Sequence, residues 1–269
     1  MKHRNLAIVA AIVVIIAIAA GLWSMLRDSA PTTTPLPDTS ARSGPVQRPD
    51  PTPQAPAPAP SYDESEAAPV DPVPVAESLQ NSDATWRDAA ERLLPDVPIG
   101  EWLAPEQQLR RWTALVEQMA EGQIAAKHRP LNYTIAPFAV DADKRASAAN
   151  YTRTTVLVNS LTAIPPERAA RYYRAWQDLF EDAYRDLGKP GSFDGRLEDA
   201  IENILAADPP PTDARLEQPS VFYRYADPEL EKQSALTKAL WRLGPENQAK
   251  VQAWVKELAE ALEQEQAAN

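Results

Sequence analysis

PPERAARYYRAWQDLFEDAYRDLG, residues 165–188, gives the strongest helix signal in this 269-residue chain. The two prolines suit the first turn of a helix, and Gly188 is a favoured residue at a helix end. Apolar side chains recur every three or four residues in between, so Tyr173, Trp176 and Phe180 share one face. A helix with such a face needs other elements to cover it. A helical domain is therefore the expected fold.

The same periodicity predicts further helices, each bounded by proline, glycine or a capping residue. They cover residues 82–94, 105–122, 149–163 and 192–204, and two more meet at Gly244-Pro245. Ser82 or Asp83 is expected to cap the first helix, and Ser192 the fourth. The Thr and Val residues of 149–163 would also suit a strand. The predicted fold class is mainly α, a bundle-like domain of about six to seven helices.

Two stretches between the helices carry β-branched and aromatic residues: Tyr133–Val140 (YTIAPFAV) and Arg215–Tyr225 (RLEQPSVFYRY). Each contains a proline, which suits an edge strand or an irregular one. Because two strands alone are marginal in water, we expect the two stretches to pair as a small two-stranded β ribbon packed on the helices. In an extended chain Phe222 and Arg224 point to one side, and their neighbours point to the other.

Leu6–Leu26 (LAIVAAIVVIIAIAAGLWSML) contains no charged residue. At about 1.5 Å per residue its length matches the ~30 Å hydrocarbon core of a bilayer. We therefore expect a single transmembrane anchor over residues 6–26 after a short cytoplasmic N-terminus, residues 1–5. A cleaved signal peptide is the alternative, although its apolar region is normally shorter. Lys2 and Arg4 narrowly favour a cytoplasmic N-terminus, which places the rest of the chain in the periplasm.

The segment after the anchor, residues 27–82, holds 13 of the 27 prolines and few large apolar side chains. Such a composition buries too little apolar surface to offset the entropy lost on ordering, so a disordered Pro-rich linker is expected. The helical domain is then predicted to occupy residues 83–262, followed by a solvated tail over residues 263–269.

The residue types available restrict the chemistry. There is no cysteine, and only one of the two histidines, His128, lies beyond the N-terminus. The chain has too few cysteine and histidine residues for a zinc site or for a Ser-His or Cys-His catalytic pair. Neither a metal nor a cofactor is therefore expected. Asp194, Glu198 and Glu202 form a row at helical spacing, which usually marks a solvated face. Residues 83–269 carry 22 Lys and Arg against 30 Asp and Glu, which argues against nucleic acid as a partner.

No residue is therefore assigned a catalytic role, and the candidate site is a partner-binding surface. The edge of Gln218–Asp227 and the corner Gly244–Asn247 are its expected parts. Tryptophan is favoured at binding hot spots, and two tryptophans are not clearly placed on the apolar helix faces. The predicted partner-binding residues are Trp102, Phe222, Arg224, Asp227, Trp241, Pro245, Glu246 and Asn247.

Two motifs, PSVFYRYADPELE (residues 219–231) and LWRLGPENQAKVQ (residues 240–252), carry a resemblance. They are similar to a family of Gram-negative bacterial proteins known as domain of unknown function 3014. LRRW (residues 109–112) and SFDGRL (residues 192–197) resemble the same family. The resemblance covers residues 83–262 and the layout of membrane helix and spacer. It implies an inner-membrane protein that faces the periplasm, and it implies no activity.

The function expected from these observations is that of a membrane-anchored periplasmic domain. It would act as a non-enzymatic binding or scaffold module of the cell envelope, with another envelope protein or a cell-wall component as its partner. The oligomeric state stays open. Two alternatives also stay open: a cell-wall glycan hydrolase that uses Asp or Glu, which would need two acids across a cleft, and an interaction domain that faces the cytoplasm.

Overall fold

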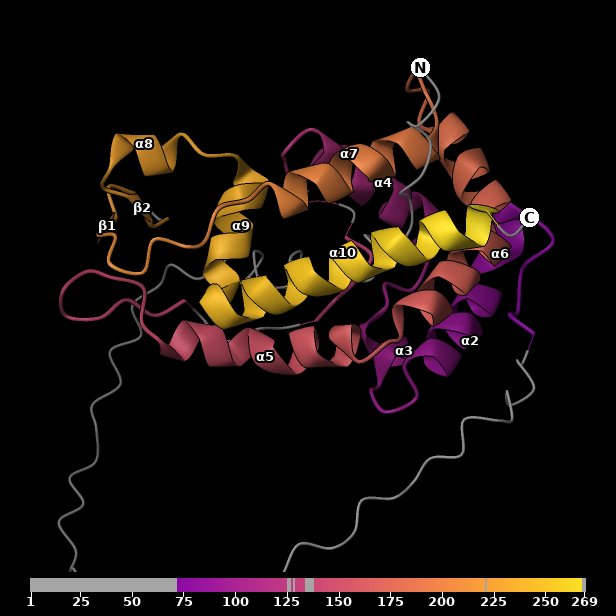
Figure 1. Cartoon of the computed structure of the whole chain (residues 1–269), viewed down its shortest axis with the longest axis horizontal. Coiled ribbons are helices and arrows are strands. Elements are labelled where there is room, and N and C mark those ends of the chain that lie inside the picture. Colours follow the sequence, from indigo (N-terminus) through magenta and orange to yellow (C-terminus); the bar gives the residue numbers. More distant parts are fainter. Residues whose placement is uncertain (1–71, 125–126, 128, 134–137, 221, 268–269) are drawn as a thin grey trace, which may run out of the picture. The chain divides into compact units, whose positions relative to one another are not determined.

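The computed structural model describes residues 72–124, 127, 129–133, 138–220 and 222–267. These residues are mainly helical and include one two-stranded antiparallel sheet (Figure 1), so the expectation of a mainly helical fold with a small sheet is confirmed. The elements in chain order are η1 (Leu79–Asn81), α2 (Ser82–Leu93), α3 (Ile99–Trp102), α4 (Gln108–Ala120), α5 (Ala149–Thr162), α6 (Pro166–Asp186), α7 (Phe193–Leu205), β1 (Leu216–Glu217), β2 (Arg224–Tyr225), α8 (Pro228–Glu231), α9 (Ala235–Leu243) and α10 (Pro245–Ala267).

The expected helices are all present, and α3 and α8 are short additions to them. α6 ends at Asp186, and Gly188 follows with φ of 67°, a left-handed conformation that glycine adopts without strain. Ser192 caps α7, since its Oγ accepts the N–H of Gly195 at 3.1 Å. The segment that also suited a strand is helix α5. Its buried residues, Leu157 among them, form one face, so packing outweighs the strand preference of Thr and Val.

Asp83 caps a helix, but not the helix that the sequence suggested. Its carboxylate oxygens accept the N–H groups of Gln107 and Gln108, each at 2.8 Å, at the start of α4. Gln107 has φ of 60°, so the chain turns sharply into α4 at this point. An acid on α2 therefore fixes where α4 begins, three residues after Pro105.

The core lies where α4, α6, α7 and α10 meet. α4 packs against α6 and α7, while α10 runs along α5, α6 and α7 (Figure 1). The rings of Phe180 and Phe193 stack at 4.9 Å with an interplanar angle of 9°. Trp86 on α2 meets Trp176 and Phe180 edge-on, at 5.2 and 5.5 Å between ring centroids. The buried apolar residues of the described chain run from Leu79 to Leu262.

Both ends of the domain differ in detail from the predicted boundaries. Leu79 is buried in the core and Val73 packs against it, although both belong to the stretch 27–82 that the sequence assigned to the linker. At the other end α10 continues to Ala267, so most of the predicted tail 263–269 is helical.

The two-stranded sheet forms in a different way from the predicted ribbon. β1 pairs with β2 in the register Leu216 with Tyr225 and Glu217 with Arg224, so both strands come from the second predicted stretch. The sheet of the described residues is therefore a hairpin within the second stretch, not a pairing of the two stretches. A hairpin closes a shorter loop and loses less chain entropy. Residues 134–137 of the first stretch lie outside the described residues, and Phe138 contacts Tyr223 at 6.0 Å between ring centroids.

The predicted transmembrane segment, residues 6–26, also lies outside the described residues, as does most of the predicted linker. Within the described ranges, none of the helices combines the length and the apolar character needed to cross a bilayer.

Candidate functional site

The hairpin β1–β2 and α8 lie at one end of the domain, beyond α9 (Figure 1, left). Phe222, in the connection between the strands, is 42% exposed, more than any other aromatic side chain of the described residues. The base of the hairpin is held in place. The ring of Tyr225 meets Trp241 edge-on at 5.5 Å, and Glu231 accepts the N–H of Tyr225 at 2.9 Å. The hairpin thus presents an exposed aromatic ring on an anchored base.

Charged side chains surround this hairpin. Arg224 Nε donates to Glu217 Oε1 at 2.7 Å, and both side chains are about half exposed. Asp227 caps α8, because its carboxylate accepts the N–H of Glu229 at 2.8 Å. A shallow hollow of about 330 Å³ lies between the hairpin and α8. Its lining residues are Glu217, Arg224, Tyr225, Ala226, Pro228, Glu231 and Lys232.

Neither of the two tryptophans expected at the surface adds to this hairpin surface. Trp241 is only 5% exposed, and its Nε1 donates to the carbonyl of Asp208 at 2.9 Å. In the domain, Trp241 packs against the ring of Tyr225. Trp102 on α3 is half-buried and packs edge-on against Tyr133 at 4.6 Å. α3 lies near the other end of the domain from α8 (Figure 1), so the structure does not bring Trp102 to the hairpin.

The corner at Gly244 is a packed joint with little free surface. Asn247 is buried, and its Nδ2 donates to the carbonyls of Tyr151 at 2.9 Å and Leu243 at 3.1 Å. Gly244 has φ of 86°, and a Cβ added there would overlap the ring of Tyr151. Pro245 and Glu246 are the exposed residues of the corner.

The row of acids on α7 is only partly a solvated face: Glu202 is exposed, whereas Glu198 is half-buried. Asp194 is half-buried and accepts hydrogen bonds from the Tyr173 hydroxyl and, at 2.7 Å, from Gln177 Nε2, both on α6. Burial raises the pKa of Asp194 above its usual value, the Tyr173 hydrogen bond opposes that rise, and nearby Glu181 adds to it. Glu181 in turn accepts the backbone N–H groups of Phe193 and Asp194 at 3.0 Å. These two acids join α6 to α7.

A buried acid, Glu117 on α4, anchors an ion network that the sequence did not indicate. Arg196 Nε lies 2.6 Å from one of its oxygens, and Lys189 Nζ lies 3.3 Å from the other. Burial alone would raise the pKa of Glu117, but the two cations outweigh burial and hold the pKa below its usual value. The three residues come from α4, α7 and the turn between α6 and α7. Their sequence separation gives no local signal.

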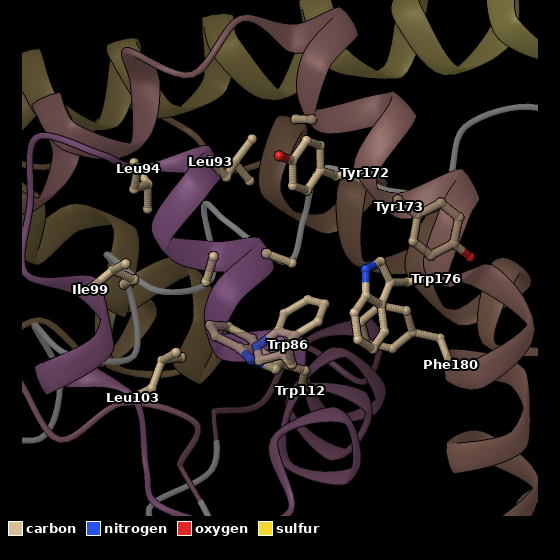
Figure 2. Close-up of a pocket in the computed structure, with 13 residues that line it drawn as sticks. Trp86, Leu93, Leu94, Ile99, Leu103, Trp112, Tyr172, Tyr173, Trp176 and Phe180 are labelled. Atoms are coloured by element: carbon tan, nitrogen blue, oxygen red, sulfur yellow. The ribbon is translucent and has the colours of Figure 1, made fainter. Parts of the chain in front are cut away.

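A narrow apolar slot lies between α2, α3, α4 and α6 (Figure 2). It encloses about 60 Å³. Its lining is aliphatic and aromatic, without a carboxylate: Trp86, Ala89, Ala90, Leu93, Leu94, Ile99, Leu103, Trp112, Ala169, Tyr172, Tyr173, Trp176 and Phe180. The sequence correctly placed Trp86 and Trp176 on apolar helix faces. It gave no sign that the two faces leave a gap between them.

Two polar features stand out in and beside the slot. Trp176 is 1% exposed, and its buried indole Nε1 has no acceptor among the residues that the structure describes. Outside, the Arg168 guanidinium lies 5.8 Å from the ring of Tyr172 and donates to the carbonyl of Arg92 at 2.5 Å. No acidic side chain of the described residues forms a salt bridge with Arg168.

A protein-family model described as "Protein of unknown function (DUF3014)" matches residues 108–259. The chain belongs to this family. The resemblance seen in the sequence motifs is thereby confirmed. The DUF3014 match runs from α4 into α10 and includes the hairpin, whereas α2 and α3, on one side of the slot, precede it. No curated protein and no solved structure matches the chain.

Proposed function

We propose that this DUF3014 protein is a non-enzymatic binding module of the cell envelope and that the hairpin β1–β2 is its contact surface. Phe222 carries the proposal, because it is an exposed aromatic side chain on a hairpin whose base is fixed by Trp241 and Glu231. Aromatic side chains dominate binding hot spots, and an anchored base reduces the entropy lost on binding.

The surroundings of Phe222 favour a protein partner. Arg224, Glu217 and Lys232 place both signs of charge around the hairpin and its hollow. Interfaces between proteins commonly combine a central aromatic residue with a polar rim. We therefore propose another envelope protein as the partner, with a recess for one aromatic ring and charges of both signs around that recess.

The proposal includes the location of the domain. Residues 6–26 would anchor the chain in the inner membrane, and the domain would lie in the periplasm. As a flexible coil, the 46 residues of 27–72 would span on the order of 40 Å, which lets the domain reach partners away from the bilayer. Reporter fusions after Asn269 test the topology. Active alkaline phosphatase is expected, and activity of a cytoplasmic reporter instead would place the domain on the other side.

A site-specific crosslinking experiment tests the contact surface in the full chain. A photoreactive amino acid replaces Phe222 in one variant and Val156 in a control. Val156, on α5, is 60% exposed and lies outside the hairpin. In intact cells the first variant is expected to form a discrete adduct that mass spectrometry identifies as an envelope protein. Identical adducts from both variants, or none from the first, would contradict the proposal.

A further inference from the structure

The residues that line the apolar slot of Figure 2 extend along α6 over about the length of a single hydrocarbon chain. On α6 its lining runs from Ala169 to Phe180, eleven residue steps, or about 16 Å at a rise of ~1.5 Å. One acyl chain of a lipid spans about half of the ~30 Å hydrocarbon core of a bilayer, a similar length. The enclosed volume of about 60 Å³ is well below the ~150 Å³ of a cavity that takes up benzene. A space this small does not hold a ring, so the part of a ligand that enters it would be a section of an extended chain, with the rest along the partly exposed lining residues.

Two residues that line the slot, Trp86 and Trp176, each have a buried indole N–H without an acceptor among the described residues. In Figure 2 the indole nitrogen of Trp176 lies on the side of its ring that faces the centre of the slot. A buried donor without an acceptor is costly, and the edge-on contact with Trp86 offers an N–H group only a weak partner in a ring face. A ligand that carries an oxygen atom would therefore bind better than a pure hydrocarbon.

The mouth of the slot carries a positive charge. Tyr172, Leu93, Ala90 and Trp86 are the partly exposed lining residues, and the Arg168 guanidinium lies over the ring of Tyr172. Its one hydrogen bond to the backbone leaves other N–H groups of the guanidinium without an acceptor among the described residues. An anionic group at the mouth would meet this cation.

We propose that the slot binds the acyl chain of a lipid with an anionic head group, with the head group at Arg168. The same chemistry is present in a free fatty acid and in an anionic phospholipid. An aliphatic side chain of a partner protein would fill the enclosed part of the slot, but it would leave the length of the slot and the cation at its mouth unused.

Photoreactive fatty acid supplied to cells that express the full chain tests the proposal. In cells such a probe is present both as the free fatty acid and, after incorporation, in phospholipids. Light then links it covalently to the residues it touches. The adducts are mapped by mass spectrometry, and their mass distinguishes a fatty acid from a phospholipid. We expect adducts on peptides from α2 and α6, in addition to any on residues 6–26.

Three variants sharpen this test. Ala90→Leu narrows the mouth and should reduce the α2 and α6 adducts by about tenfold, since it occupies the path of the chain. Arg168→Gln should reduce them by roughly threefold to tenfold through loss of the ion pair. Arg185→Gln removes the same charge from the far end of α6, where the arginine is exposed and pairs with Asp182, and should leave them unchanged.

Thermal melting of each purified variant shows whether the domain still folds. If Ala90→Leu unfolds the domain, Arg168→Gln compared with Arg185→Gln still tests the proposal. Adducts absent from α2 and α6, or spread equally over α5 and α10, would overturn it and leave the slot to a side chain of a partner protein. Equal losses in the two arginine variants would also overturn it.

Discussion

Helix α6 and the hairpin β1–β2 use aromatic residues in opposite ways. On α6, Tyr173, Trp176 and Phe180 are all buried, and each contributes to the ring contacts of the core. On the hairpin, Tyr225 packs against Trp241 and Tyr223 contacts Phe138, whereas Phe222 remains exposed. Both stretches are rich in aromatic residues, so a high aromatic content alone does not distinguish a core from a binding surface. The backbone makes the distinction, because a helix gathers every third or fourth side chain on one face.

The largest effect should follow from removing an aromatic ring from α6. Phe180 is fully buried and lies between Trp86, Tyr173 and Phe193. Phe180→Ala should lower the free energy of unfolding by about 3–5 kcal/mol, because it deletes packed apolar surface and leaves a cavity. Chemical denaturation of the purified protein measures this. A loss below ~1 kcal/mol would show that the α6 face is not the centre of the core.

The ion network of Glu117 should give the next largest effect, and one that depends on pH. Its folded-state pKa lies below the ordinary value, so its stabilising contribution is present above about pH 4.3 and is lost as the pH falls through the folded-state pKa. At pH 7, Glu117→Gln should lower the free energy of unfolding by about 1–3 kcal/mol.

The control for this prediction is Glu246→Gln, at an exposed acid of the helix corner, which should have little effect at either pH. Unfolding curves at pH 7 and pH 3 make the comparison. The difference between wild type and Glu117→Gln should shrink at the lower pH. A difference that stays constant would show that the charge of Glu117 does not stabilise the fold.

The sequence predicted the helical body well because its signals are local. Proline before Glu167, glycine after Leu187 and the spacing of Trp176 and Phe180 all lie within one element and agree with one another. The hairpin was predicted less well. The same short stretch supplies both of its strands, and the choice of pairing partner depends on loop closure rather than on side-chain alternation.

The candidate sites depend on distances between helices, which a single sequence does not encode. Asp83 was expected to cap its own helix but binds the start of α4, and Trp241 was expected at the surface but supports Tyr225. Phe222 is exposed as expected, although it lies in the connection between the strands rather than in a strand. The sequence does not indicate the slot beside Trp176, because an apolar helix face has the same residue pattern whether or not the neighbouring helices pack against it without a gap.

The inward-facing residue of the hairpin should respond to alkaline pH. Burial raises the pKa of Tyr225 to about 12, above the ordinary value near 10. Its stabilising contribution is therefore fully present below pH 10 and is lost as the pH rises through 12. In the wild type, the contact with Trp241 should loosen over this range, which hydrogen exchange or tryptophan fluorescence detects. Tyr225→Phe should shift this loosening to higher pH and change stability little at pH 7. An unchanged transition would assign it to another group.

The smallest effect on stability should come from the outward-facing residue of the same hairpin. Phe222→Ala removes an exposed ring that the core does not use, so the free energy of unfolding should change by no more than about 0.5 kcal/mol. Compared with Phe180→Ala, this substitution removes the same atoms from the opposite environment. In cells, with a photoreactive group placed at Ser220, Phe222→Ala should abolish the adduct formed by the otherwise wild-type chain. A loss of stability close to that of Phe180→Ala would mean that Phe222 is part of the core, and a persistent adduct would move the contact surface away from this ring.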